Sequence, residues 1–389
     1  MSELVVRIAA RGDGVTQSGK HMPFGVPGDT LLDDGTLTPG PHRQVPPCRH
    51  FPECGGCQLQ QADDEAYRGY LVSRVETALA QHGLTTEIRQ PHLSPPWTRR
   101  RAILRAMRVG KGAVLGFNAA KSHRIVDIHE CHILRPELFA LVAPLRALLG
   151  GLLQPKRTAE VQLSLVDGGV DVLLKGVVAE DLAAIEGLTS FARDQALARL
   201  SVDAGLGPET LYEPRPASVT LSGRRVAFPP GSFLQATEDG EAALVEAVKE
   251  AAGGSKRAAD LFAGLGTFAL AVEAAYAAEA SRDAAASLKR AAPAMTVEHR
   301  DLYRRPLDAE ELKPFDAVVL DPPRAGAEEQ VRALARSAIE SIAYVSCNPA
   351  TFARDAKALA DGGYKLEWVR PVGQFRWSTH VELAACFRR

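Results

Sequence analysis

The stretch DLFAGLGTFAL, residues 260–270, decides how the C-terminal half of the chain folds. An apolar strand ends in Asp260, and two glycines and an apolar helical pattern follow. Glycines there let the backbone approach a ligand at the carboxyl end of the strand, and an acidic residue about 20 positions later can bind ribose hydroxyls. Glu279 occupies that position. The stretch alone also fits a ligand-free turn, and it does not exclude dinucleotide binding.

Around this stretch, strand-like and helix-like patterns alternate. A helical pattern at 238–252 precedes it, and six strand-like runs follow it: YAAEA, AMTVEH, FDAVVLD, SIAYVSC, YKLEWVRPV and HVELAACF. Such alternation predicts a parallel sheet with helices on both faces. Only a short QFRWST turn separates the last two runs, which predicts an antiparallel hairpin at the edge of the sheet.

The chain before residue 231 has a different pattern. Its first 47 residues hold seven Gly and six Pro with short β-like runs. Strand patterns with hairpin turns prevail from residue 98, together with helical patterns near 136–149 and 179–198. We therefore predict a β module, a mostly antiparallel α+β domain and an α/β domain, at 1–47, 48–230 and 231–389.

Two further strand ends carry reactive side chains. In LDPPRAG the two prolines cannot continue a strand or a helix, so they hold Asp321 in a rigid loop where ligands bind; the alternative is a simple chain break. In YVSCNPATFARD, Cys347 lies where a strand gives way to a helix N-terminus, a position that favours the thiolate and hence a nucleophile. A buried structural cysteine is the alternative.

Glu382 stands in the otherwise apolar run HVELAACF. Desolvation disfavours the charged form of a carboxylate and raises its pKa, which suits a general base near neutral pH. A solvent-exposed position on an edge strand is the alternative.

Three of the six cysteines fall within ten residues, Cys48, Cys54 and Cys57, and Cys131 follows far downstream. The N-terminus lacks the pattern of a secretory signal and no run of eighteen apolar residues exists, so we expect a cytoplasmic protein without a membrane span. In a reducing compartment such a cluster indicates a metal site or catalytic thiols more often than disulfides. The spacing allows either zinc or an iron–sulfur cluster.

The net charge of −1 gives no overall basic field for binding nucleic acid. Residues 97–124 nevertheless carry eight Lys or Arg and no Asp or Glu. This segment is either a solvated strand face or a stripe that contacts phosphates.

The joint occurrence of CGGCxxQ, GSFLQ, DLFAGLGTF, LDPPRAG, SCNP and HVE, in this order, resembles the S-adenosylmethionine-dependent RNA 5-methyluridine methyltransferases. Within that family it resembles the iron–sulfur branch that modifies 23S ribosomal RNA. The resemblance runs from Cys48 to the C-terminus. It implies an enzyme of EC class 2.1.1 with a Rossmann-like, seven-stranded methyltransferase sheet, a central α+β domain carrying a metal cluster, and a shortened N-terminal TRAM module, an OB-like barrel.

The resemblance also implies roles for individual residues. Cys347 would be the nucleophile that adds to uracil C6, and Glu382 would be the base that removes the C5 proton. S-adenosylmethionine would contact Gln235, Phe262, Gly264, Gly266, Thr267, Glu279, Asp301 and Asp321. A [4Fe–4S] cluster would be held by Cys48, Cys54, Cys57 and Cys131. Thr237 departs from the family, which often has Asn at this position.

Two alternatives remain at this point. The first is a tRNA uridine C5-methyltransferase, although the bacterial enzymes of that kind generally lack the four-cysteine set. The second is a catalytically idle iron–sulfur protein that binds ribosomal RNA. In each case we expect an RNA partner, no membrane association and a monomer without an obligate protein partner.

Overall fold

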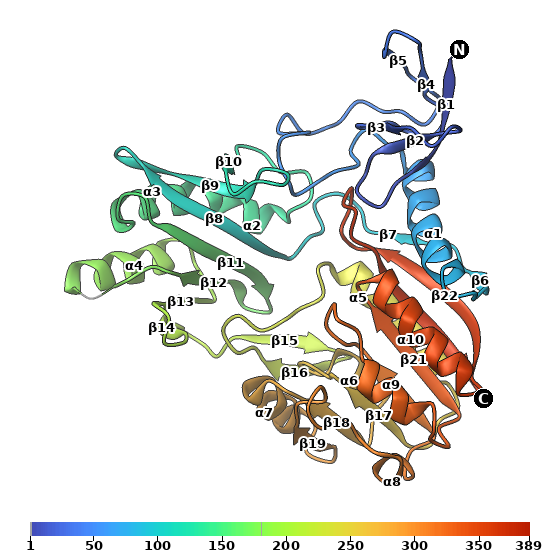
Figure 1. Cartoon of the computed structure of the whole chain (residues 1–389). Coiled ribbons are helices and arrows are strands. Elements are labelled where there is room, and N and C mark those ends of the chain that lie inside the picture. The colour runs from blue at the N-terminus through green and yellow to red at the C-terminus, as the bar shows by residue number, and fades with distance from the viewer. Residues whose placement is uncertain (1, 180) are drawn as a thin grey trace.

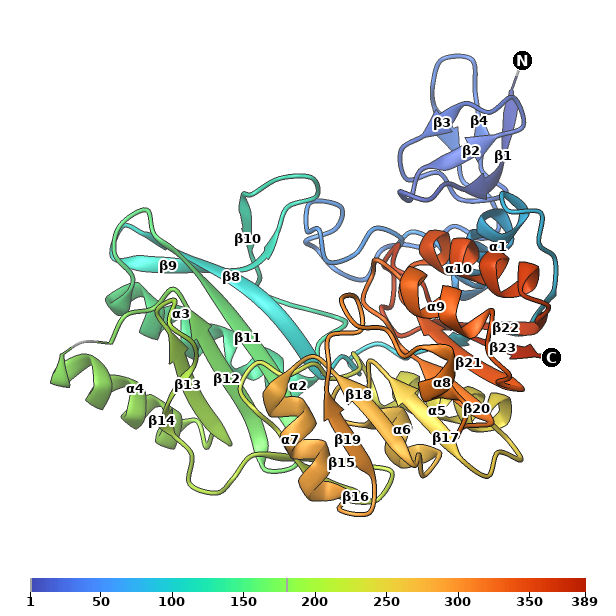
Figure 2. The ribbon, with the colours of Figure 1, turned by 60° about the horizontal axis from the view of Figure 1, so that its bottom comes forward.

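The structure is a computed structural model, and it describes residues 2–179 and 181–389. The described residues form four separate sheets, of nine, seven, five and two strands. Figures 1 and 2 show the small N-terminal module beside one end of the C-terminal half, and the central sheet on the other side. No helix of the described residues is long and apolar enough to cross a membrane.

The C-terminal sheet contains the seven strands that the sequence predicted. Six of them run in one direction, and only β23 is antiparallel to its two neighbours, β21 and β22. Their order across the sheet is β19-β18-β17-β20-β21-β23-β22. Their bounds are β17 Ala258–Leu261, β18 Tyr276–Glu279, β19 Thr296–His299, β20 Ala317–Leu320, β21 Ser341–Ser346, β22 Lys365–Gly373 and β23 Glu382–Arg388.

Two expectations about this sheet were wrong. It has nine strands, because the short strands β6 (Glu87–Ile88) and β7 (His92–Leu93) both pair with β22. The final hairpin therefore does not lie at the edge. Strands of two residues are too short to leave a periodic pattern in the sequence, although they supply partners for N–H and C=O groups that β22 would otherwise leave open.

Helices cover both faces of this sheet, which explains why its strands are apolar at successive positions. Val318 and Leu320 face α1, α9 and α10, whereas Val319 between them faces α5. Figure 1 shows α1, α9 and α10 lying together. The helices have the bounds α1 Asp64–Ala80, α5 Glu238–Ala251, α6 Thr267–Ala271, α7 Arg282–Ala291, α8 Ala309–Leu312, α9 Glu328–Leu334 and α10 Pro349–Asp361.

The central sheet is antiparallel as predicted, except for the parallel pair β12–β13. Its order is β10-β9-β8-β11-β12-β13-β14. The strands are β8 Arg101–Val109, β9 Gly112–Asn118, β10 Ile125–Asp127, β11 Thr158–Val166, β12 Gly169–Lys175, β13 Arg199–Asp203 and β14 Glu209–Tyr212, and the helices are α2 Pro136–Ala140, α3 Val142–Leu152 and α4 Leu182–Asp194. The helix expected at 179–198 thus begins at Leu182, and residue 180 lies outside the described residues. A separate hairpin is formed by β15 (Ser218–Leu221) and β16 (Arg224–Ala227).

The N-terminal module is a five-stranded antiparallel sheet in the order β3-β2-β1-β4-β5. Asp29 holds it together from a fully buried position, where its carboxylate accepts bonds from the backbone N–H groups of Val26 and Gly40 and from Arg43. The strands are β1 Glu3–Ile8, β2 Gly14–Thr16, β3 His21–Met22, β4 Thr30–Leu31 and β5 Leu37–Thr38.

A substitution in α1 tests whether this helix belongs to the core of the C-terminal sheet. Leu71 is fully buried there. We expect Leu71→Ala to lower the free energy of unfolding by about 2–5 kcal/mol, because it deletes buried methyl groups and leaves a cavity. Urea denaturation measures the change. Val45→Ala is the control, since Val45 is 89% exposed and should shift stability by less than about 0.5 kcal/mol. Equal effects of the two substitutions would contradict this packing.

Candidate active site

A cavity of about 940 Å³ lies between the C-terminal sheet and strand β8 of the central sheet. It opens at the carboxyl ends of the parallel strands, where ligands bind in sheets of this kind. Nine of the ten residues expected at the cofactor and catalytic sites line it: Gln235, Phe262, Gly264, Thr267, Glu279, Asp301, Asp321, Cys347 and Glu382. The topology thus brings together side chains that are widely separated in the sequence.

One side of the cavity has the features of a nucleoside site. The carboxylate of Glu279 accepts hydrogen bonds from the backbone N–H groups of Gly264 (2.8 Å) and Ser281 (2.6 Å), so it ties the glycine turn to the start of α7. The ring of Phe262 lies 5.6 Å from that of Tyr303, whose hydroxyl donates to the carbonyl of Gly326 (3.0 Å). Tyr303 was not predicted, although it follows Asp301 by only two residues.

Gly266 is the expected contact that does not line the cavity. Its backbone has a φ of +93°, and a Cβ at this position would lie 2.4 Å from Cδ1 of Leu288 in α7. Glycine is therefore required here by the close packing of α6 on α7. The neighbouring Gly264, with a φ of +56° and open space around it, meets the cavity.

Glu382 is the first residue of β23 and is 5% exposed. Burial raises the pKa of its carboxyl to about 7, although a hydrogen bond from Gln374 and the charges of Arg101 and Arg324 oppose that rise. The position is therefore not the exposed edge considered as an alternative. A carboxylate with this pKa can accept a proton near neutral pH.

Cys347 lies at the end of β21, and here one expectation was wrong. Burial, together with the nearby carboxylates of Glu382 and Asp321, raises the pKa of the thiol to about 11, so the helix N-terminus does not make it a thiolate. The first turn of α10 offers few free donors, because Pro349 has no N–H and the side chain of Asn348 accepts from Ala350 N–H.

The loop that follows β20 is held rigidly, as its prolines predicted. Asn348 and Thr351 each donate to the carbonyl of Arg324 (3.0 and 3.1 Å), and Arg354 donates to the carbonyl of Ala325 (3.0 Å). This loop begins with Asp321, which is half-buried and lines the cavity, and burial raises the pKa of its carboxyl.

The basic segment 97–124 does not form one continuous stripe. Arg99 and Arg101 line the cavity, and the Arg101 guanidinium stacks 4.5 Å from the ring centre of Phe233. Arg100 points elsewhere and pairs with Glu241 (2.6 Å), while Arg105 pairs with Glu160 (2.9 Å). Alternation along an extended chain places Arg99 and Arg101 on one face and Arg100 on the other, whereas Arg105 shares the face of Arg101 but lies further along β8.

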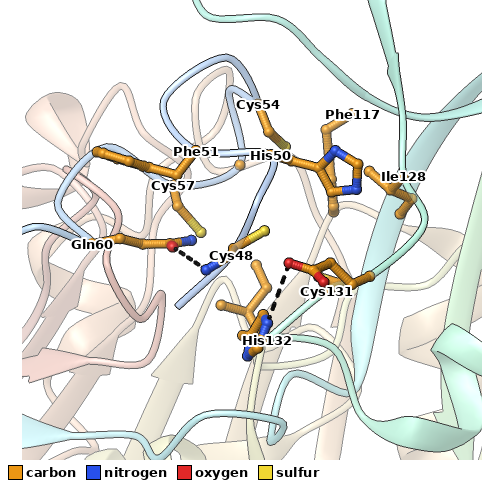
Figure 3. Close-up of a pocket in the computed structure, with 13 residues that line it drawn as sticks. Cys48, His50, Phe51, Cys54, Cys57, Gln60, Phe117, Ile128, Cys131 and His132 are labelled. Carbon is orange, nitrogen blue, oxygen red and sulfur yellow. Dashed lines mark hydrogen bonds and ion pairs between the residues drawn. The ribbon is translucent and has the colours of Figure 1, made fainter. Parts of the chain in front are cut away.

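The four cysteines of the predicted metal site line a second, smaller pocket. Figure 3 shows Cys48, Cys54 and Cys57 on one loop, next to the segment that carries Cys131. Burial raises the pKa of the Cys54 thiol to about 11 and that of Cys57 to about 12. Within residues 2–179 and 181–389, no group of three or more His, Cys, Asp or Glu is arranged to hold a metal ion. Gly56 lines both pockets, so this loop separates them.

Comparisons with known proteins agree with this site. Residues 287–389 match the family model described as tRNA (uracil-5-)-methyltransferase. An RNA methyltransferase of Zymomonas mobilis is 49% identical, with 99% of each chain covered. The 23S rRNA (uracil(1939)-C(5))-methyltransferase RlmD of Chromohalobacter salexigens is 33% identical over 89% of this chain and 76% of its own. The chain belongs to the RNA (uracil-5-)-methyltransferase family.

The fold agrees with this membership. The tRNA (uracil-54, C5)-methyltransferase of Pyrococcus abyssi, solved with S-adenosyl-L-homocysteine, superposes over the whole of both chains with a TM-score of 0.74 at 21% identity, which shows a common fold. The family expected from the sequence is confirmed. This RNA (uracil-5-)-methyltransferase is an S-adenosylmethionine-dependent enzyme of EC class 2.1.1 with a mixed α/β methyltransferase fold.

A pair of substitutions tests the packing role of Gly266. We expect Gly266→Ala to lower the free energy of unfolding by roughly 2–4 kcal/mol, because it combines a strained left-handed backbone with an overpacked core. Gly254→Ala is the matched control, since Gly254 has a φ of +83° in open space and should cost only about 1 kcal/mol. Thermal unfolding without ligand measures both. Similar losses in the two variants would show that Leu288 does not restrict this position.

Proposed function

We propose that this enzyme transfers a methyl group from S-adenosylmethionine to C5 of a specific uridine in 23S ribosomal RNA. The observation that carries the proposal is the single cavity shared by Cys347, Glu382 and the expected cofactor contacts. The 23S substrate is supported by the similarity to RlmD and by the four-cysteine set. We expect the enzyme to act as a cytoplasmic monomer whose residues 1–47 form a shortened TRAM module.

The chain supplies the two groups that uracil methylation needs. Uracil C5 is a poor nucleophile. The Cys347 thiol releases its proton to solvent, and addition of the resulting thiolate to C6 shifts the electron pair of the C5–C6 double bond onto C5. Bound S-adenosylmethionine would supply an electrophilic methyl group on its sulfonium sulfur. The carboxylate of Glu382 then removes the proton from C5, and the electron pair of that C–H bond forms the C5–C6 double bond as the Cys347 thiolate leaves.

The cavity is large enough for a base as well as a cofactor, since binding sites for small ligands occupy about 300–1,000 Å³. A uracil can enter it only after leaving its stack, so we propose that the target uridine is single-stranded or extruded. Arg101 and Phe233 form a cationic and aromatic wall beside the space for that base.

The thiols of Cys48, Cys54, Cys57 and Cys131 line one pocket, and four thiolates are a ligand set for a [4Fe–4S] cluster as well as for a structural zinc ion. The resemblance to the iron–sulfur branch of the family favours the cluster. We propose that Cys48, Cys54, Cys57 and Cys131 bind it, and that it has a structural role, since methyl transfer moves no net electrons.

The metal assignment is tested by purifying the protein without oxygen. We expect about four iron and four sulfide per chain, with a brown colour, and we expect Cys54→Ser to lose both. Cys386→Ser is the control, because Cys386 is buried in β23 away from this pocket. Stoichiometric zinc in a colourless protein would contradict the assignment.

The RNA substrate is tested in a strain that lacks the gene. Mass spectrometry of 23S ribosomal RNA should show the loss of one 5-methyluridine, restored by the wild-type gene and not by Cys347→Ala. Loss of 5-methyluridine from tRNA instead would support the tRNA alternative. Rescue of a growth defect by Cys347→Ala, without methylation, would indicate an idle RNA-binding protein.

A further inference from the structure

We propose that Gln374 is a positioning residue, which holds the base Glu382 and the amide of Gln235 in one fixed arrangement. The inference rests on the proposed function, because it assigns Glu382 the removal of the C5 proton. Gln374 directly follows β22, and its side chain is absent from the lining of the cavity. It acts on the reaction only through the two residues that it contacts.

The amide of Gln374 is fully engaged between three segments of the chain. Its Nε2 donates to Oε1 of Gln235 (2.8 Å) and to Oε2 of Glu382 (3.0 Å). Its Oε1 accepts from the backbone N–H of Ala236 (3.0 Å). Both N–H donors of the amide are therefore used, and the side chain is only 1% exposed.

The packing leaves Gln374 no room to move away from these partners. A Cβ on Gly240 in α5 would lie 2.7 Å from Cβ of Gln374 and 3.2 Å from its Oε1. The N-terminus of α5 is itself held in place, because Thr237 accepts from Gly240 N–H (3.0 Å) and bonds to Ser94 (2.8 Å). Thr237 therefore caps the helix that supports Gln374.

This arrangement determines how Gln235 faces the cavity. Its Oε1 is occupied by Gln374, and its Nε2 lies 3.5 Å from Oδ2 of Asp321. If the Gln235 amide were rotated by 180°, its N–H donors would face the N–H donors of Gln374. Gln374 thus keeps a hydrogen-bond donor of Gln235 directed at the ligand space.

The same amide favours the ionised form of the base. The groups that face Glu382 are Arg101 from β8 and Arg324 from the loop after β20, with the acidic groups of Asp321 and Cys347 also within range. The Gln374 bond and the two arginines lower the pKa of Glu382, which burial raises to about 7. Loss of that bond raises the pKa further, so the base becomes ionised only at higher pH.

The test is Gln374→Met, which keeps the size of the side chain and removes both donors. We expect the turnover rate to fall roughly 10- to 100-fold, because the variant loses part of the rate enhancement that a general base supplies. We also expect the rate to increase with pH only at a higher pH than in the wild type. The covalent adduct between the RNA and Cys347 should accumulate, because its breakdown needs Glu382. Denaturing gels with labelled substrate RNA measure the adduct.

A matched control separates positioning from simple loss of stability. Gln330 is also 1% exposed and bonds through its amide to the backbone of Leu307, away from the cavity. Gln330→Met should lower stability without moving the pH profile or trapping an adduct. If Gln374→Met behaves in the same way, the positioning role is wrong.

Two further variants keep this inference distinct from the proposed function. Glu382→Gln should trap the adduct strongly, and Cys347→Ala should form none. If both of these results are obtained but Gln374→Met breaks down the adduct at the normal rate, only the positioning role is wrong. If Glu382→Gln and the wild type both lack a Cys347-dependent adduct, the proposed function fails and this inference with it.

Discussion

The carboxylate of Glu382 is buried at the start of a central strand, and the surrounding structure must compensate for removing a charge from water. An unpaired buried carboxylate is costly, so such a group is stable only with hydrogen bonds and opposite charges near it. Gln374 supplies the bond, and Arg101 and Arg324 supply the charges. These partners come from the central sheet, from the loop after β20 and from the turn before β23. The site can therefore form only when the two larger sheets are docked together.

The loop that leads to Glu382 is bonded to the segment that carries the cysteines. The backbone N–H groups of Gln58 and Leu59 both donate to the carbonyl of Trp377 (2.8 and 2.9 Å). The side chain of Gln58 accepts from the N–H of Thr379 (3.2 Å). The loop of Cys48, Cys54 and Cys57 is thus hydrogen-bonded directly to the loop before Glu382, although more than 300 residues separate them in sequence.

Much of this organisation could be predicted from local patterns. The alternation after residue 231 predicted all seven strands β17–β23, and the motif residues at strand ends converge because carboxyl ends of parallel strands share one edge. Glycine is required at position 266, however, because the side chain of Leu288 leaves no space for a Cβ, and no motif indicates this contact. Burial and carboxylates from other parts of the chain raise the pKa of the Cys347 thiol, so that pKa could not be inferred from its place before a helix. Gln374 belongs to no sequence motif, so its positioning role can be inferred only from its contacts in the structure.

The pairing of β6 and β7 with β22 also has consequences for folding during synthesis and for cutting the chain into fragments. β6 and β7 are synthesised almost 300 residues before β22, so they cannot form this pairing until the C-terminal part of the chain has left the ribosome. A fragment cut at residue 231 would expose the outer backbone groups of β22, an open template for aggregation. The C-terminal sheet therefore depends on residues 87–93 to complete its outer edge.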